Sequence, residues 1–325
     1  MTSPQQALVS VNIVTRNRRE ALAKAIHSVC NQTYQPIELV VVDNDSSDGS
    51  ADMVESEWPQ ARVIRIHRNI GCQPGRNIGM KNCRGTYIFN LDDDGWLEPS
   101  TIKQIVDRFR KDDAVGLIMA GIVAPEGSYA STPTNVPYEQ RVIGNFVGAA
   151  HAVRASVLDT VGYFPEYPRG ASESNLALRM IDAGYELLHL PNAIMYHELS
   201  QIERSDNTHR YFHVWHDLEN VCRLYPLTRI PFTCIWKAGL HGYRALGQGT
   251  FRGYCRGIIR FIYELPMIIQ ERKPVRRWAV QKQSYLVNST ITSLEDSKSF
   301  KGYGFWETVR DRLLKPNRAS QGRSG

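Results

Sequence analysis

The sequence contains no long hydrophobic run and no cysteine pair at metal-site spacing. The longest apolar stretches in the tail, around residues 257–270, are interrupted by Arg260 and Glu264, and none reaches the roughly 18–20 residues that a membrane-spanning helix needs. Near the N-terminus Asn12 and Thr15 break the apolar run and no basic segment precedes it, so we expect no signal peptide. The six cysteines show no CxxC pairing and no histidine at zinc spacing, which favours reduced structural thiols in a cytoplasmic protein.

Charge is distributed unevenly along the chain. Of 325 residues, 42% are hydrophobic and 22% are charged, the composition of an ordinary globular protein. Residues 200–325 hold 21 Lys and Arg against 10 Asp and Glu, whereas residues 1–199 hold 18 against 23. We therefore expect a domain at about residues 1–200, a basic, aromatic helical extension at 201–315 and a disordered Ser-, Gly- and Arg-rich tail at 316–325.

The first half of the chain alternates between strand and helix patterns. Continuous apolar, β-branched or aromatic segments predict strands at 9–14, 39–42, 62–66 and 87–91, and such strands are typical of a parallel sheet covered on both faces. A polar cluster follows each strand. Because ligands bind beyond the carboxyl ends of parallel strands, these clusters are expected to converge on one edge of the sheet.

Three consecutive carboxylates, Asp92, Asp93 and Asp94, follow the fourth strand. Adjacent anions at a strand end repel one another unless a cation lies among them, and carboxylate oxygens suit Mg²⁺ or Mn²⁺. The alternative is a solvated acidic turn.

Several segments occur in an order that resembles the family 2 glycosyltransferases. They are Val9-Ser-Val-Asn-Ile-Val-Thr-Arg-Asn17, Gln32-Thr-Tyr34, Glu38-Leu-Val-Val-Val-Asp-Asn-Asp-Ser-Ser-Asp-Gly-Ser50, Gly75-Arg-Asn-Ile-Gly79 and Leu91-Asp-Asp-Asp94. The resemblance covers roughly residues 8–200. It implies a GT-A α/β fold, Rossmann-like, with a mostly parallel sheet flanked by helices and a mostly helical C-terminal extension. The implied activity is metal-dependent, inverting transfer of a sugar from a nucleotide donor.

The resemblance also assigns the donor site. Asp43 and the loop after the first strand would hold the nucleotide, the loop residues being Thr15, Arg16 and Asn17. Asn44 stands where many relatives carry a second Asp, so the resemblance does not specify the nucleotide base of the donor. Arg76 matches a position near the diphosphate, which suits a guanidinium. The alternatives are an Asx-rich turn that caps the next helix and a solvated arginine.

In relatives the acidic triplet supplies the metal motif, with Mg²⁺ or Mn²⁺ as the ion. Asp94 would hold the cation directly, and Asp92 and Asp93 would reach the ribose or the metal and its waters. His197 matches a place where a histidine completes the metal shell in many GT-A enzymes. A satisfied structural histidine is the alternative.

On the acceptor side, Asn145–Ala150 resembles a strand at the base of the cleft, and Ser172-Glu173 stands where relatives usually read Glu-Asp. Glu173 takes the place of the catalytic base, which accepts the proton of the acceptor hydroxyl. One base on the face opposite the leaving group implies inversion. Alternatively, Glu173 only complements a helix dipole, a contribution of about 0.3–1 kcal/mol.

From Arg210 onward, basic and aromatic residues alternate with apolar ones. Amphipathic basic helices suit an anionic membrane surface and a lipid-linked glycan acceptor, or they simply pack on the domain. No RNP or OB pattern is present, so we expect no nucleic-acid partner. The expected location is the cytoplasm, either free or peripheral on the inner face of the cell membrane.

Two other functions fit parts of the sequence. A nucleotidyltransferase shares the nucleotide site and the metal, but it usually needs a Gly-rich, Lys-bearing loop, and residues 15–19 contain no glycine. A non-catalytic protein that binds sugar nucleotides or membranes would explain Ser172 in place of the usual acid.

Overall fold

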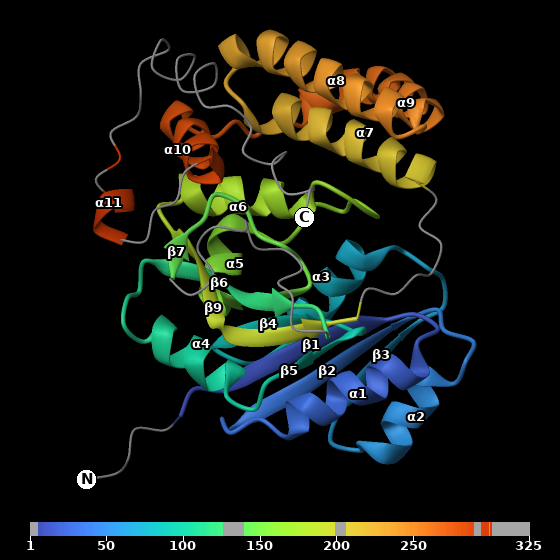
Figure 1. Ribbon diagram of the computed structural model, residues 1–325, viewed down its shortest axis with the longest axis vertical. Coiled ribbons are helices and arrows are strands. Elements are labelled where there is room, and N and C mark those ends of the chain that lie inside the picture. The colour runs from blue at the N-terminus through green and yellow to red at the C-terminus, as the bar shows by residue number, and fades with distance from the viewer. Residues whose placement is uncertain (1–5, 126–139, 199–205, 289–293, 299, 301–325) are drawn as a thin grey trace, which may run out of the picture.

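The computed structural model describes residues 6–125, 140–198, 206–288, 294–298 and 300 (Figure 1). In these residues nine strands form one sheet in the order β3-β2-β1-β4-β8-β6-β9-β5, with β7 paired to β9. The strands are β1 (Val9–Thr15), β2 (Ile37–Asn44), β3 (Arg62–Ile66), β4 (Tyr87–Asp92), β5 (Gly95–Leu97), β6 (Val115–Val123), β7 (Arg141–Val142), β8 (Ala150–Arg154) and β9 (Glu186–His197). The expected disordered tail at 316–325 lies outside the described residues.

The sheet is mostly parallel, as expected. β1 pairs in parallel with β2 and β4, β2 pairs in parallel with β3, and β6 pairs in parallel with β9. Four pairs are antiparallel. β8 lies between β4 and β6 and is antiparallel to both, and β5 and β7 are each antiparallel to β9. The carboxyl ends of β1, β2 and β4 therefore meet at one edge.

Helices cover both faces of the sheet (Figure 1). Leu22 of α1, Val54 of α2 and Ile105 of α4 join one core, and Met80 of α3 and Leu176 of α6 join the other. Side chains alternate along β4, so that Phe89 enters the first core and Ile88 the second. The helices of this part are α1 (Arg19–Cys30), α2 (Ser50–Glu57), α3 (Cys72–Asn82), α4 (Thr101–Phe109), α5 (Ala155–Val161) and α6 (Ser172–Asp182).

The described part of the chain after β9 is mostly helical, which confirms the expected helical C-terminal part. It forms α7 (Asp206–Leu224), a 3₁₀ turn η1 (Leu227–Arg229), α8 (Ile230–Gly247), α9 (Phe251–Gln270), α10 (Arg277–Asn288) and α11 (Leu294–Lys298). α7, α8 and α9 pack together beyond α6, whereas α10 packs directly on α6 (Figure 1). Among the described residues, no helix combines the length and the apolar character needed to cross a membrane.

Candidate active site

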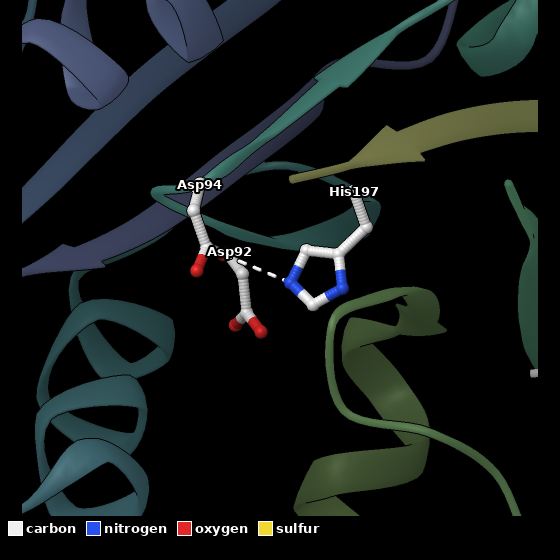
Figure 2. Close-up of side chains that lie close together, drawn as sticks. All are labelled: Asp92, Asp94 and His197. Atoms are coloured by element: carbon white, nitrogen blue, oxygen red, sulfur yellow. Dashed lines mark hydrogen bonds and ion pairs between the residues drawn. The ribbon is translucent and has the colours of Figure 1, made fainter. Parts of the chain in front are cut away.

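The acidic strand end and the end of β9 meet at one point. Asp92 closes β4, and pairing of β5 with β9 sets Gly95 opposite His197. One ligand atom each of Asp92, Asp94 and His197 lies within 4.8 Å of the others, and His197 Nε2 is 2.9 Å from Asp94 Oδ1 (Figure 2). Two carboxylates and an imidazole form a donor set that fits Mn²⁺ or Mg²⁺. The three residues that the sequence nominated for the metal are thus side by side.

Arg18 forms ion pairs with Asp93 and Asp94. Its Nη1 donates to Asp93 Oδ1 at 2.9 Å and to Asp94 Oδ2 at 2.5 Å. Burial acts to raise the pKa of Asp94, but the hydrogen bond and charge of His197 and the charge of Arg18 lower it on balance. Asp94 therefore stays ionised, as a metal ligand must.

Asp93 has a different environment from its neighbours. Its Oδ2 accepts a hydrogen bond of 2.8 Å from Thr15 Oγ1, so it is held toward β1. Burial raises the pKa of Asp93 to about 6, against the opposing charge of Arg18. Asp93 lies outside the cluster of possible metal ligands.

A chain of hydrogen bonds connects the acidic cluster to Glu173. Arg76, only 4% exposed, forms an ion pair with Asp92, and its Nη1 donates to Gln73 Oε1 at 2.9 Å. Gln73 Nε2 in turn donates to Glu173 Oε1 at 2.8 Å. Arg76 is therefore buried among polar groups, which excludes the alternative of a solvated arginine.

Gly148 is packed against this chain. A Cβ at position 148 would lie 2.6 Å from Glu173 Oε1 and 2.7 Å from Arg76 Nη1. The strand expected at Asn145–Ala150 is wrong except for its last residue, since β8 begins at Ala150. A turn at 148–149 precedes it and carries the backbone close to both side chains.

Other predicted donor-site residues lie at the ends of β1 and β2. Asp43 is 5% exposed, and no group among the described residues donates a hydrogen bond to its Oδ1. Such a buried, unpaired acceptor can be satisfied by a bound ligand. Asn44 is instead occupied within the protein, because its side chain bonds to Asn69, Ile70 and Gly71.

The loop after β1 is mostly exposed. Arg16 lies 3.9 Å from Asp45, and Asn17 Oδ1 accepts from the Ser47 backbone N–H at 2.7 Å. Asp48 Oδ1 accepts from the backbone N–H of Ser50, the first residue of α2, at 3.0 Å, and its Oδ2 accepts from the Arg19 N–H at 3.0 Å. These bonds tie the ends of β1 and β2 together.

Two residues of the site were missed by the sequence reasoning, Arg18 and Gln73. Both lie in polar stretches that follow strands and were therefore in the expected region. Their partners are 75 and 100 residues away in the sequence, so that no local pattern could have identified them.

An open sheet with parallel strands, whose ends carry an acidic triplet and a histidine, has the architecture of the GT-A fold. The solved mannosyltransferase PcManGT of Pyrobaculum calidifontis, in complex with GDP-Man and Mn²⁺, shares this fold with a TM-score of 0.54 at 17% identity. The alignment covers 95% of this chain and 88% of that one.

Residues 10–165 match the family described as glycosyl transferase family 2. The chain is 30% identical over 139 residues to the chondroitin synthase of Escherichia coli, and 26% identical over 149 residues to the putative teichuronic acid biosynthesis glycosyltransferase TuaG of Bacillus subtilis. The matches cover 41% and 43% of this chain, but only 20% and 59% of those relatives.

Proposed function

We propose that the protein is an inverting, metal-dependent glycosyltransferase of the hexosyltransferase type. It moves a sugar from a nucleotide donor to a saccharide or a lipid-linked glycan. The observation that carries this proposal is the hydrogen-bonded chain from Asp92 through Arg76 and Gln73 to Glu173. This chain fixes a carboxylate base beside a site for a metal and a diphosphate, which is what such a transfer requires.

Asp92, Asp94 and His197 would hold Mg²⁺ or Mn²⁺. The bound ion would supply positive charge for the leaving diphosphate. The fit rests on the donor set, two carboxylates and an imidazole with ligand atoms within 4.8 Å of one another. The Mn²⁺ of the mannosyltransferase structure is consistent with this assignment.

Arg76 places a guanidinium group beside Asp92, and Arg18 places a second one beside Asp93 and Asp94. A guanidinium binds phosphate oxygens with two N–H groups, so both can orient the diphosphate while the carboxylates keep them in place. The unpaired Oδ1 of Asp43 is the acceptor that we assign to the nucleotide. The Thr15 hydroxyl orients Asp93, and the exposed Arg16 and Asn17 complete the rim of the nucleotide site.

Glu173 stands at the first turn of α6 and is partly buried. In the proposed reaction its carboxylate accepts the proton of the acceptor hydroxyl as the oxygen attacks the anomeric carbon. The leaving diphosphate departs from the opposite face of the sugar. A single attack of this kind inverts the anomeric configuration.

The acceptor follows from the relatives. One is a chondroitin synthase and another a putative teichuronic acid biosynthesis enzyme, so we infer a role in the biosynthesis of a cell-envelope polysaccharide. We place the protein in the cytoplasm, at the inner face of the cell membrane, where nucleotide sugars are available to a lipid-linked acceptor.

The proposal is tested with Asp94→Asn and Glu173→Gln, with Asp107→Asn as the matched control. Asp107 is an exposed carboxylate of α4 that pairs with Lys103. Transfer from a panel of nucleoside diphosphate sugars is measured with EDTA and after addition of Mn²⁺. We expect both site variants to be folded and roughly 10²–10⁴-fold slower, with inverted product in NMR spectra of the wild type.

Activity of Glu173→Gln at the level of the control would remove this residue as the base. Full transfer activity in the presence of EDTA would contradict the proposed metal requirement. Calorimetry that shows donor binding without turnover on any acceptor would favour the non-catalytic alternative.

A further inference from the structure

The outer surface of α8 and α9 is apolar and exposed. Among the described residues fifteen large hydrophobic side chains are exposed, and thirteen of them lie between Leu227 and Ile269. We call the outer face the exposed apolar set Phe232, Ile235, Trp236, Leu240, Tyr243 and Leu246 of α8 with Ile259, Ile262, Tyr263, Met267 and Ile269 of α9. So many exposed apolar side chains on two helices that pack together mark an interaction site rather than ordinary solvent-facing protein.

The pattern on α8 is that of one helix side. The spacing of these positions, one, three or four residues apart, sets them on one side of the helix. They are 232, 235, 236, 239, 240, 243 and 246. Ile235 is 75% exposed and Tyr243 is 78% exposed, whereas His241 and Ala245 on the opposite side are buried. An apolar side of a helix normally packs inward. Here it points to solvent.

α7 accounts for the buried sides of both helices. Phe261 and Ile268 of α9 join Val214, Leu218 and Cys222 of α7 in a separate small core. α7 in turn packs on α6, which lies next to the sheet (Figure 1). The outer face is therefore directed away from the catalytic domain, and no other helix or strand of the described residues buries it.

The segment that carries the outer face has an excess of positive charge. Residues 227–273 contain eight Lys and Arg and two Asp and Glu. Arg244, Arg252, Arg256 and Lys273 are exposed. Both acids are paired within the protein, Glu264 with Arg260 and Glu271 with Arg223.

We infer that the outer face of α8 and α9 docks on an anionic lipid bilayer, with its apolar side chains in the interfacial layer and its arginines on lipid phosphates. Neither helix can span a bilayer, so they would lie in the plane of the interface. Trp236, Tyr243 and Tyr263 are the residue types that prefer this depth. A second copy of the chain fits less well, because a self-complementary contact would bring like-charged rims together.

This inference also narrows the acceptor, a step that rests on the proposed function. A protein held on the bilayer by α8 and α9 encounters acceptors that are anchored in the same bilayer. The accepted class is therefore a glycan on a lipid carrier rather than a free saccharide. Binding to lipid itself does not depend on catalysis.

The test is sedimentation of the full chain with vesicles, without donor or acceptor. One set contains phosphatidylcholine with phosphatidylglycerol, and the other contains phosphatidylcholine alone. The variant Ile235→Glu/Trp236→Glu is compared with Val287→Glu, an exposed apolar residue of α10 outside the outer face. Arg244→Gln/Arg252→Gln is compared with Arg110→Gln, an exposed arginine after α4.

We expect the wild type and both controls to bind the anionic vesicles, and the outer-face variant to bind about tenfold less. The arginine variant should lose most of the preference for anionic over neutral vesicles. Thermal transitions within about 2 °C of the wild type would show that all variants fold, and transfer to a water-soluble, short-chain analogue of the lipid-linked glycan should be unchanged.

A wild type that stays in the supernatant, or an outer-face variant that binds as well as Val287→Glu, would overturn the inference. A concentration-dependent dimer in light scattering, lost in the outer-face variant and accompanied by no vesicle binding, would assign the face to a second copy instead. Neither result would touch the assignment of the reaction centre.

Discussion

Gly148 lies beside both Glu173 and Arg76, in the turn before β8. Alanine there would bring a Cβ within 2.6–2.7 Å of the two charged side-chain ends. Because those ends can move while the backbone stays, we expect Gly148→Ala to fold and to lose about 10–100-fold in kcat/KM, since small displacements of reacting groups slow catalysis strongly. Steady-state kinetics and thermal unfolding measure the two effects.

Gly239→Ala is the matched control, because a Cβ at Gly239 meets nothing within 4 Å. Its activity should equal that of the wild type. Equal activity of Gly148→Ala would show that the close approach has no bearing on the reaction.

At the scale of residues, the sequence predicted which side chains lie together in the site, but not the hydrogen bonds that connect them. Asp92, Asp94 and His197 meet as the family pattern implies. Glu173 is connected to Asp92 through Gln73 and Arg76. Side-chain bonds between residues this distant in sequence depend on tertiary packing, which local patterns do not encode.

At the scale of elements, α10 and α11 secure the start of β9. Lys282 Nζ is 2.6 Å from Glu186 Oε1, and Ser297 Oγ donates to the other carboxylate oxygen at 2.8 Å. All three residues are buried. Removal of one partner leaves the other charge buried and unpaired, which is costly.

We therefore expect Lys282→Met to lower the free energy of unfolding by about 3–5 kcal/mol in chemical denaturation. Addition of Glu186→Gln to this variant should recover part of the loss. Lys298→Met, which breaks an exposed pair with Asp112, should cost less than about 1 kcal/mol. A loss in Lys282→Met no larger than in Lys298→Met would contradict this account.

The four strands predicted in the first hundred residues were placed well, because each is a continuous apolar run bounded by polar turns, whereas the short β5 was not predicted. The error at Asn145–Ala150 has a physical cause. Val147 is exposed and Gly148 turns the chain, so an apolar segment here serves close packing at the site rather than the sheet. The positions of α10 and α11 against β9 could not be predicted either, since they depend on tertiary contacts.

At the scale of the whole molecule, acid should destabilise the fold through buried histidines. Burial lowers the pKa of His189, His213 and His216 from an ordinary 6.5 to about 4, and that of His151 to about 3. Between these values and pH 6.5 the unfolded chain binds protons that the folded chain does not. Stability is therefore complete above pH 6.5 and declines as pH falls toward 4.

Each such histidine contributes a slope of up to about 1.4 kcal/mol per pH unit in this window. Urea denaturation at a series of pH values measures it. In His216→Gln the free energy of unfolding should fall less steeply with decreasing pH than in the wild type, because the contribution of one histidine to the slope is lost. An identical slope in the two proteins would show that His216 does not titrate as proposed.

The stacking of α8 and α9 on α7, and of α7 on α6, has a geometric consequence for how the protein would work at a bilayer. Glu173 belongs to α6, so its height above the lipid is set by rigid packing rather than by a hinge. The enzyme would then reach only acceptor hydroxyls at one distance from the membrane surface. Lipid-linked glycans that are shorter or longer than this distance would not be modified.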